Sequence, residues 1–133
     1  MNVIELKTAI YEFLATKSSR VFDEQAPAKV AYPYVVFSLT SSMTDENQER
    51  EDFDLLIDVY DNNQFNSTDL DTLVGQIDGD GAITSASGLH RRHHYEASVL
   101  RADFYRDTRT VNYEPDERVR HVELGYTVMC YLE

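Results

Sequence analysis

The chain has 133 residues, a length that suits one domain with its own hydrophobic core, and 42% of them are apolar. Its 24 acidic residues against 12 basic ones give a net charge of −12, which argues against binding to nucleic-acid phosphates or to an anionic membrane surface. The single cysteine, Cys130, excludes a disulfide within these residues and is predicted to be a buried, unreactive thiol. Residues 1–5 lack the basic start of a signal peptide and no apolar run reaches the roughly 20 residues of a membrane span, so we expect an intracellular protein.

Residues 3–14 are predicted to form an amphipathic helix, because their apolar positions recur at intervals of three and four residues. Asn2 is a suitable N-cap, and the polar residues 17–19 end the helix. A short extended piece follows at residues 20–22. Residues 32–40 are rich in β-branched and aromatic side chains and predict a strand, with Pro33 at its beginning.

Residues 41–51 have no apolar periodicity, so we expect a long hairpin connection or a mobile loop. Residues 53–60 alternate between apolar and polar side chains, which predicts a strand with one buried face. Three aspartates lie on its other face, which we expect to be wet and negative: Asp52, Asp54 and Asp58.

The second half of the chain contains one more predicted helix and two more predicted strands. Residues 67–77 have helical periodicity, polar residues that can cap the N-terminus, and glycines at 79 and 81 that end the helix. Residues 95–105 look extended but change phase near residue 99, which predicts a bulge. A second polar connection, residues 106–118, precedes a final strand over 119–132. The element order predicts a single α+β domain over residues 1–133, with a mainly antiparallel sheet of about four to five strands and two helices on one face.

Candidate chemical sites are few. His90, His93 and His94 lie within five residues, but their spacing fits no standard zinc motif and the adjacent arginines oppose a cation. Asp116 and Glu123 suggest a nuclease site, yet no lysine stands two residues after Glu123. No nucleophile elbow and no phosphate-binding glycine loop occurs. The sequence therefore predicts no enzyme, no cofactor and no metal site, with a metal-dependent enzyme using His90–His94 as the weakest alternative.

The two polar connections are the more unusual feature, because long structureless connections in small domains are commonly functional or disordered. We predict that they contact assembly partners. The candidate contact residues are Met43, Asp45, Glu46, Glu49, Arg50, Arg106, Arg109, Tyr113 and Arg118.

Two segments of the sequence resemble a known protein family. The N-terminal helix followed by Arg20-Val21-Phe22-Asp23-Glu24, and then Tyr32-Pro33-Tyr34-Val35-Val36-Phe37, is similar to the tail-completion proteins of long-tailed phages and prophages, also called tail terminators or tail-to-head joining proteins. The likeness extends over nearly the whole chain through the order of its elements. The long polar connection at residues 106–118 and the histidines at 90–94 are not features associated with this family.

The resemblance implies a structural protein of the virion, at the interface of tail and head, assembled in the host cytoplasm. Its subunits would form a ring, usually of six, that caps the tail tube and joins it to the head connector. Its partners would be the tail-tube protein and the connector, without sequence-specific binding of nucleic acid. An acidic inhibitor that mimics DNA is the alternative, although the basic residues are spread through the sequence rather than segregated.

Overall fold

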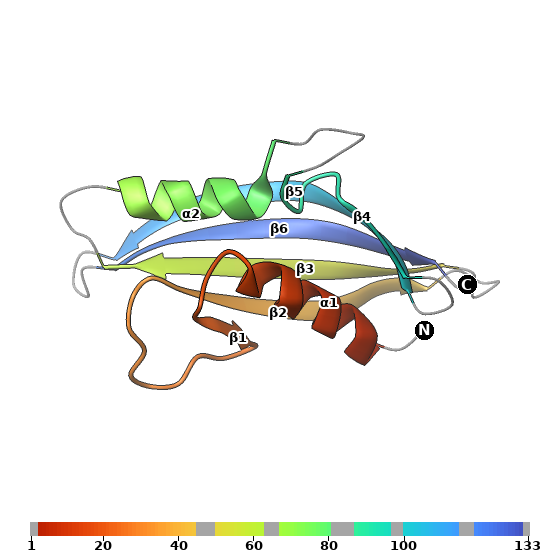
Figure 1. Cartoon of the computed structure of the whole chain (residues 1–133), viewed down its shortest axis with the longest axis horizontal. Helices are drawn as coiled ribbons and strands as arrows, with labels where there is room; N and C mark the ends of the chain where they lie inside the picture. Colours follow the sequence, from red (N-terminus) through yellow and green to blue (C-terminus); the bar gives the residue numbers. More distant parts are fainter. Residues whose placement is uncertain are drawn as a thin grey trace.

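The computed structural model describes residues 3–44, 50–62, 67–80, 87–96, 100–114 and 119–131. Two helices and six strands make up these residues (Figure 1). In chain order the elements are α1 (Val3–Ala15), β1 (Val21–Asp23), β2 (Tyr34–Thr44), β3 (Arg50–Asp61), α2 (Thr68–Asp78), β4 (His93–Glu96), β5 (Leu100–Glu114) and β6 (Val119–Tyr131). In the described part of the chain, neither helix has the length and apolar character to span a membrane.

All six strands belong to one sheet in the order β1-β2-β3-β6-β5-β4. The predicted α+β class is confirmed, but the strand count of four to five was too low and the sheet is mixed. The additional parallel pair arises because β1 follows α1 and lies beside β2, with Val21 opposite Val35. The other four pairings are antiparallel.

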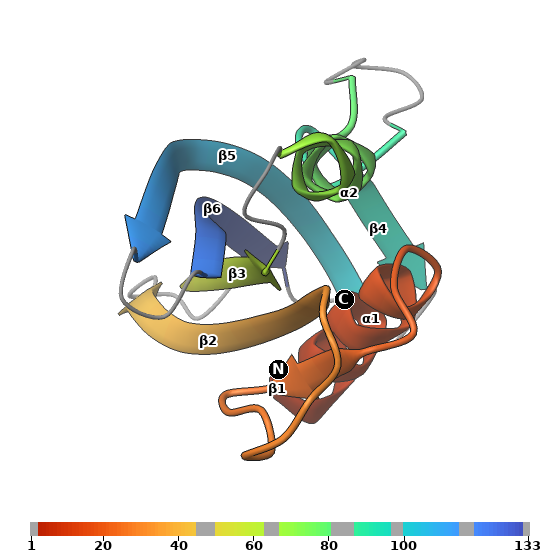
Figure 2. The same cartoon turned by 90° about the vertical axis from the view of Figure 1, so that its left-hand side faces the viewer.

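The sheet is strongly curled, and both helices lie on the same side of it (Figure 2). The predicted alternation of β3 is confirmed, because every second residue from Phe53 to Val59 is buried. Residues Val122 to Cys130 alternate in the same way on β6. These side chains pack against Leu6, Ile10 and Leu14 of α1 and Leu70, Val74 and Ile77 of α2 in one hydrophobic cluster.

Within the polar stretch 41–51, the residues that the structure describes, 41–44 and 50–51, lie in strands rather than in a loop. β2 continues to Thr44 and β3 begins at Arg50, so Met43 and Arg50 lie in strands. The end of β2 stays extended because it pairs with β3, although the pairing is irregular between Ser41 and Met43. This pairing does not need apolar alternation, so the sequence pattern did not reveal it. Asp45, Glu46 and Glu49 lie outside the described residues.

The second polar connection is also mostly strand. β5 runs to Glu114, so Arg106, Arg109 and Tyr113 belong to it, while Arg118 lies outside the described residues. Pairing with β6 along its whole length holds this segment extended, and a bulge lies between Arg106 and Thr108. Sequence periodicity missed it because most side chains beyond Phe104 are exposed.

The single strand predicted over residues 95–105 is instead two antiparallel strands. β4 ends at Glu96, β5 begins at Leu100, and these two residues face each other in the register. The change of phase near residue 99 therefore reflects a reversal of the chain; residues 97–99 themselves lie outside the described residues.

The C-terminal end of α2 packs closely, backbone against backbone, on the segment at Gly88. Gly79 has a φ of +81°, as predicted for a helix-ending glycine, and its N–H donates to the Gly75 carbonyl over 2.8 Å. A Cβ on Gly79 would lie 2.2 Å from the backbone nitrogen of Gly88. Ser67 holds the N-cap position, but its hydroxyl accepts no capping hydrogen bond from a backbone N–H and instead donates to the Asp71 carboxylate.

Candidate functional site

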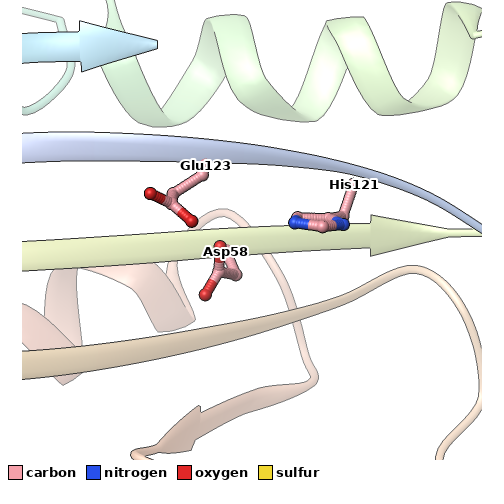
Figure 3. A group of neighbouring side chains, drawn as sticks. All are labelled: Asp58, His121 and Glu123. Carbon is pink, nitrogen blue, oxygen red and sulfur yellow. The ribbon is translucent and has the colours of Figure 1, made fainter. Parts of the chain in front are cut away.

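The face of the sheet opposite the helices carries a group of three ionisable side chains (Figure 3). Asp58 of β3 lies directly across from Glu123 of β6, and His121 lies two residues before Glu123 on the same strand. One potential ligand atom from each residue lies within 4.8 Å of the other two. The register between β3 and β6 therefore brings together two carboxylates and an imidazole.

The two carboxylates repel each other in a partly desolvated setting. Asp58 is half-buried, and its Oδ1 atom is shielded from solvent without a hydrogen-bond partner among the described residues. Burial, and then the negative charge of Glu123, raise the pKa of Asp58 above its ordinary value, while His121 acts in the opposite direction. The site therefore favours the protonated form of Asp58 more than water does.

An aromatic row holds the imidazole in place. The His121 ring stacks on Tyr60 at a centroid distance of 5.0 Å, and Tyr60 stacks on Tyr34 of β2 at 4.8 Å. The amide nitrogen of Asn112 on β5 lies 3.2 Å from His121 Nε2. One imidazole nitrogen and two carboxylates are donor types that divalent metals accept.

Sequence reasoning found Asp58 but did not connect it with His121 or Glu123. The alternation of the last strand assigns 121 and 123 to its polar phase, and that was the available signal. The pairing partner and register of this strand were not readable from the sequence, so the three residues could not be brought together.

The predicted acidic residues of β3 lie on the expected face of the sheet, but their side chains differ in solvent exposure. Asp54 is exposed and Asp58 is half-buried. Asp52 is only 7% exposed, and both of its oxygens accept hydrogen bonds of 2.8 Å from Arg50. Arg50, a predicted assembly contact, therefore neutralises one member of the predicted acidic face.

The three clustered histidines do not converge on one point. His93 Nδ1 contacts the carboxylate of Asp103, and His94 Nε2 lies 2.8 Å from Glu96. His90 Nδ1 accepts a 3.1 Å hydrogen bond from the backbone of Arg106. Each imidazole thus has a separate partner, and these contacts do not support the metal-dependent alternative.

A basic cleft lies where β5 meets the segment before β4. It has a volume of about 530 Å³ and is lined by His90, Arg91, His93, Asp103, Tyr105 and Arg106. Seven of the 12 lysines and arginines fall between residues 91 and 120, whereas residues 1–80 hold 16 acidic and five basic residues. The basic residues are thus denser between residues 91 and 120 than before them, although the same stretch also holds six acidic residues, so the two signs are not segregated.

The predicted contact residues on β5 differ in how far contacts within the fold engage their side chains. Arg106 forms an ion pair with the buried Asp78 at the end of α2, so it holds the fold together. Arg109 lies 3.8 Å from Asp71, with both side chains well exposed. Tyr113 is 46% exposed, and its ring is covered on one side by Arg120 at 4.9 Å.

Comparison with known proteins is informative at the level of the fold. No family model and no curated protein matches the sequence. A chain in the solved structure "Virion of native gene transfer agent (GTA) particle" matches the fold with a TM-score of 0.60 over 95% of this chain and 94% of that one. The two sequences are 15% identical, so the likeness concerns the fold alone.

Proposed function

We propose that the protein is a structural subunit of a phage-like virion, and more specifically a tail terminator that caps the tail tube and joins it to the head. The observation that carries the proposal is the shared fold, which extends over nearly the full length of both this chain and a chain of a gene transfer agent virion. The segment Tyr32–Phe37 supports the tail-terminator role, because it resembles the corresponding segment of tail-completion proteins.

The surface of the described residues agrees with a role in assembly. Large apolar or aromatic side chains are exposed on both sides of the bulge in β5: Tyr105, Val111 and Tyr113. Such residues in a strand at a sheet edge are typical of protein–protein contacts. The proposed partners are further copies in a ring, the tail-tube protein and the head connector.

The acidic face has a proposed role in the same assembly. Asp54, Asp58 and Glu123 lie on the side of the sheet without helices. If this face lined the ring, its negative potential would repel DNA phosphates and let the genome pass without sticking. Residues Asp45, Glu46 and Glu49 are proposed to contribute to the contacts between subunits or with the tube.

The test is to add the purified protein to polymerising tail-tube protein from the same genome and to measure tube length by electron microscopy. A terminator limits the tubes and is seen at one end of each, and its mass in solution or on tubes corresponds to a ring. Tubes that grow unchanged, together with a protein that stays monomeric, would overturn the proposal. Inhibition of a DNA-binding enzyme by the monomer would support the DNA-mimic alternative instead.

A further inference from the structure

The outer edge of β5 is open over its second half. β6 pairs with β5 from Arg101 to Glu114, whereas β4 pairs only with Leu100 to Asp103. Backbone contacts from residues 91 and 92 extend this cover to Phe104, and His90 accepts the N–H of Arg106. From Asp107 to Glu114, no strand among the described residues pairs with the outer edge.

This edge has some of the features that protect sheet edges in monomers, namely the bulge between Arg106 and Thr108 and three charged residues. It lacks others, because residues 107–114 contain neither proline nor lysine. Val111 is 64% exposed and Tyr113 is 46% exposed, both on an extended segment of backbone. A long edge of this kind is a template for another strand unless a partner covers it.

The opposite edge of the sheet is open as well. β1 covers β2 only from Val35 to Phe37, so residues 38–44 of β2 have no outer strand in the part of the chain that the structure describes. Thr40 and Ser41 on this edge are exposed. The two open edges are similar in length, with eight residues in 107–114 and seven in 38–44.

The charges beside the two edges are complementary. Arg109 projects from β5 on the face that carries the helices, because it is paired with the buried Leu124 and contacts Asp71 of α2. Beside the β2 edge, Glu51 lies on the same face, since it is paired with the buried Cys130 and accepts a 3.1 Å hydrogen bond from Ser41. A sheet continued from one copy to the next keeps its faces on the same sides, which brings these opposite charges toward each other.

We propose that the open edge of β5, residues 107–114, pairs with the open edge of β2, residues 38–44, of a second copy of this chain, so that the sheet continues from one copy into the next. The two surfaces differ, so the contact is head-to-tail, and repetition of such a contact closes a ring when its rotation permits. The inference rests on the proposed ring and names its interface.

A cysteine pair tests which edges meet. Val111 and Ser41 lie on the same face of the sheet, opposite the buried residues Val122 and Phe53 respectively, and the native Cys130 is buried. Under mild oxidation of the assembled protein, the double variant V111C/S41C is expected to give a ladder of crosslinked oligomers. V111C alone and S41C alone are the matched controls and are expected to stay uncrosslinked. Dimers from V111C alone would show a symmetric β5–β5 contact and overturn the inference.

Charge reversal gives an independent test by mass in solution. Arg109→Glu and Glu51→Arg should each weaken self-association at least tenfold, because each places like charges at the interface. Mixing the two variants should restore assembly, because alternating copies regain an opposite pair at every contact. Circular dichroism of each variant checks that the fold is intact.

Two outcomes separate the inference from the function on which it rests. Wild-type rings with unchanged assembly of both charge variants would overturn the interface and leave the terminator role standing. A wild-type chain that forms no ring, alone or with tail-tube protein, would overturn both.

Discussion

Asp58 and Glu123 face each other across β3 and β6 on the side of the sheet that carries no helix. Like charges directly opposite on neighbouring strands destabilise a sheet, and here one Asp58 oxygen is also shielded from water. The fold contains this unfavourable pair at the centre of a face that we propose for the ring lining, and its consequences can be measured.

Replacing Asp58 by Asn should stabilise the protein at pH 7 by about 0.5 kcal/mol, because it removes the like-charge pair. The pKa of Asp58 is raised in the folded protein, so the ionised group costs stability above that pKa and not below its ordinary pKa. The gain should therefore disappear as the pH falls toward about 4. Urea unfolding at several pH values measures it. Asp54→Asn is the matched control, because Asp54 is exposed opposite Thr127, and it should change little.

Replacing Tyr126 by Phe should destabilise the protein by about 1–3 kcal/mol, because the buried Asp78 loses a hydrogen bond. The Tyr126 hydroxyl donates to Asp78 Oδ1 over 2.8 Å, and the other oxygen is held by Arg106. Thermal unfolding measures the loss. Tyr105→Phe on the exposed surface is the control, and an equal effect of the two substitutions would show that the buried carboxylate does not depend on the phenol.

Replacing Gly125 by Ala should destabilise the protein by about 1–3 kcal/mol, because a Cβ there would lie 2.4 Å from the Thr108 hydroxyl oxygen at the β5 bulge. Thr108 is branched at its own Cβ, so its rotamers offer little relief. The second substitution Thr108→Ala removes that oxygen and should recover most of the loss. A double-mutant cycle by urea unfolding gives the coupling, and purely additive effects would contradict the steric explanation.

Cys130 should resist alkylation at pH 8 in the folded protein and react promptly when urea is added. It is fully buried, and burial followed by the negative charges of Glu51, Asp52 and Asp103 raises the pKa of its thiol to about 12. Labelling followed by mass spectrometry measures the rate. A thiol engineered at Ser41 provides the reactive control, and equal rates at the two positions would show that Cys130 is accessible.

Local patterns in the sequence were sufficient for the elements that bury one face. The periodicity over residues 3–14 predicted α1, the alternation over 53–60 predicted β3, and the run 119–132 predicted β6 and its buried cysteine. In each case the hydrophobic effect selects residues on one side of the element, and the selection leaves a period in the sequence. The acidic character of the chain was likewise fixed by composition.

Only the tertiary structure decided where β2, β3 and β5 end and what lies beside them. The 107–114 half of β5 is held by its ladder with β6 and buries little, so no apolar period marks it and it was predicted as a connection. The Asp58–His121–Glu123 group depends on the register between β3 and β6, which brings together residues more than 60 positions apart in sequence and which only strand pairing determines.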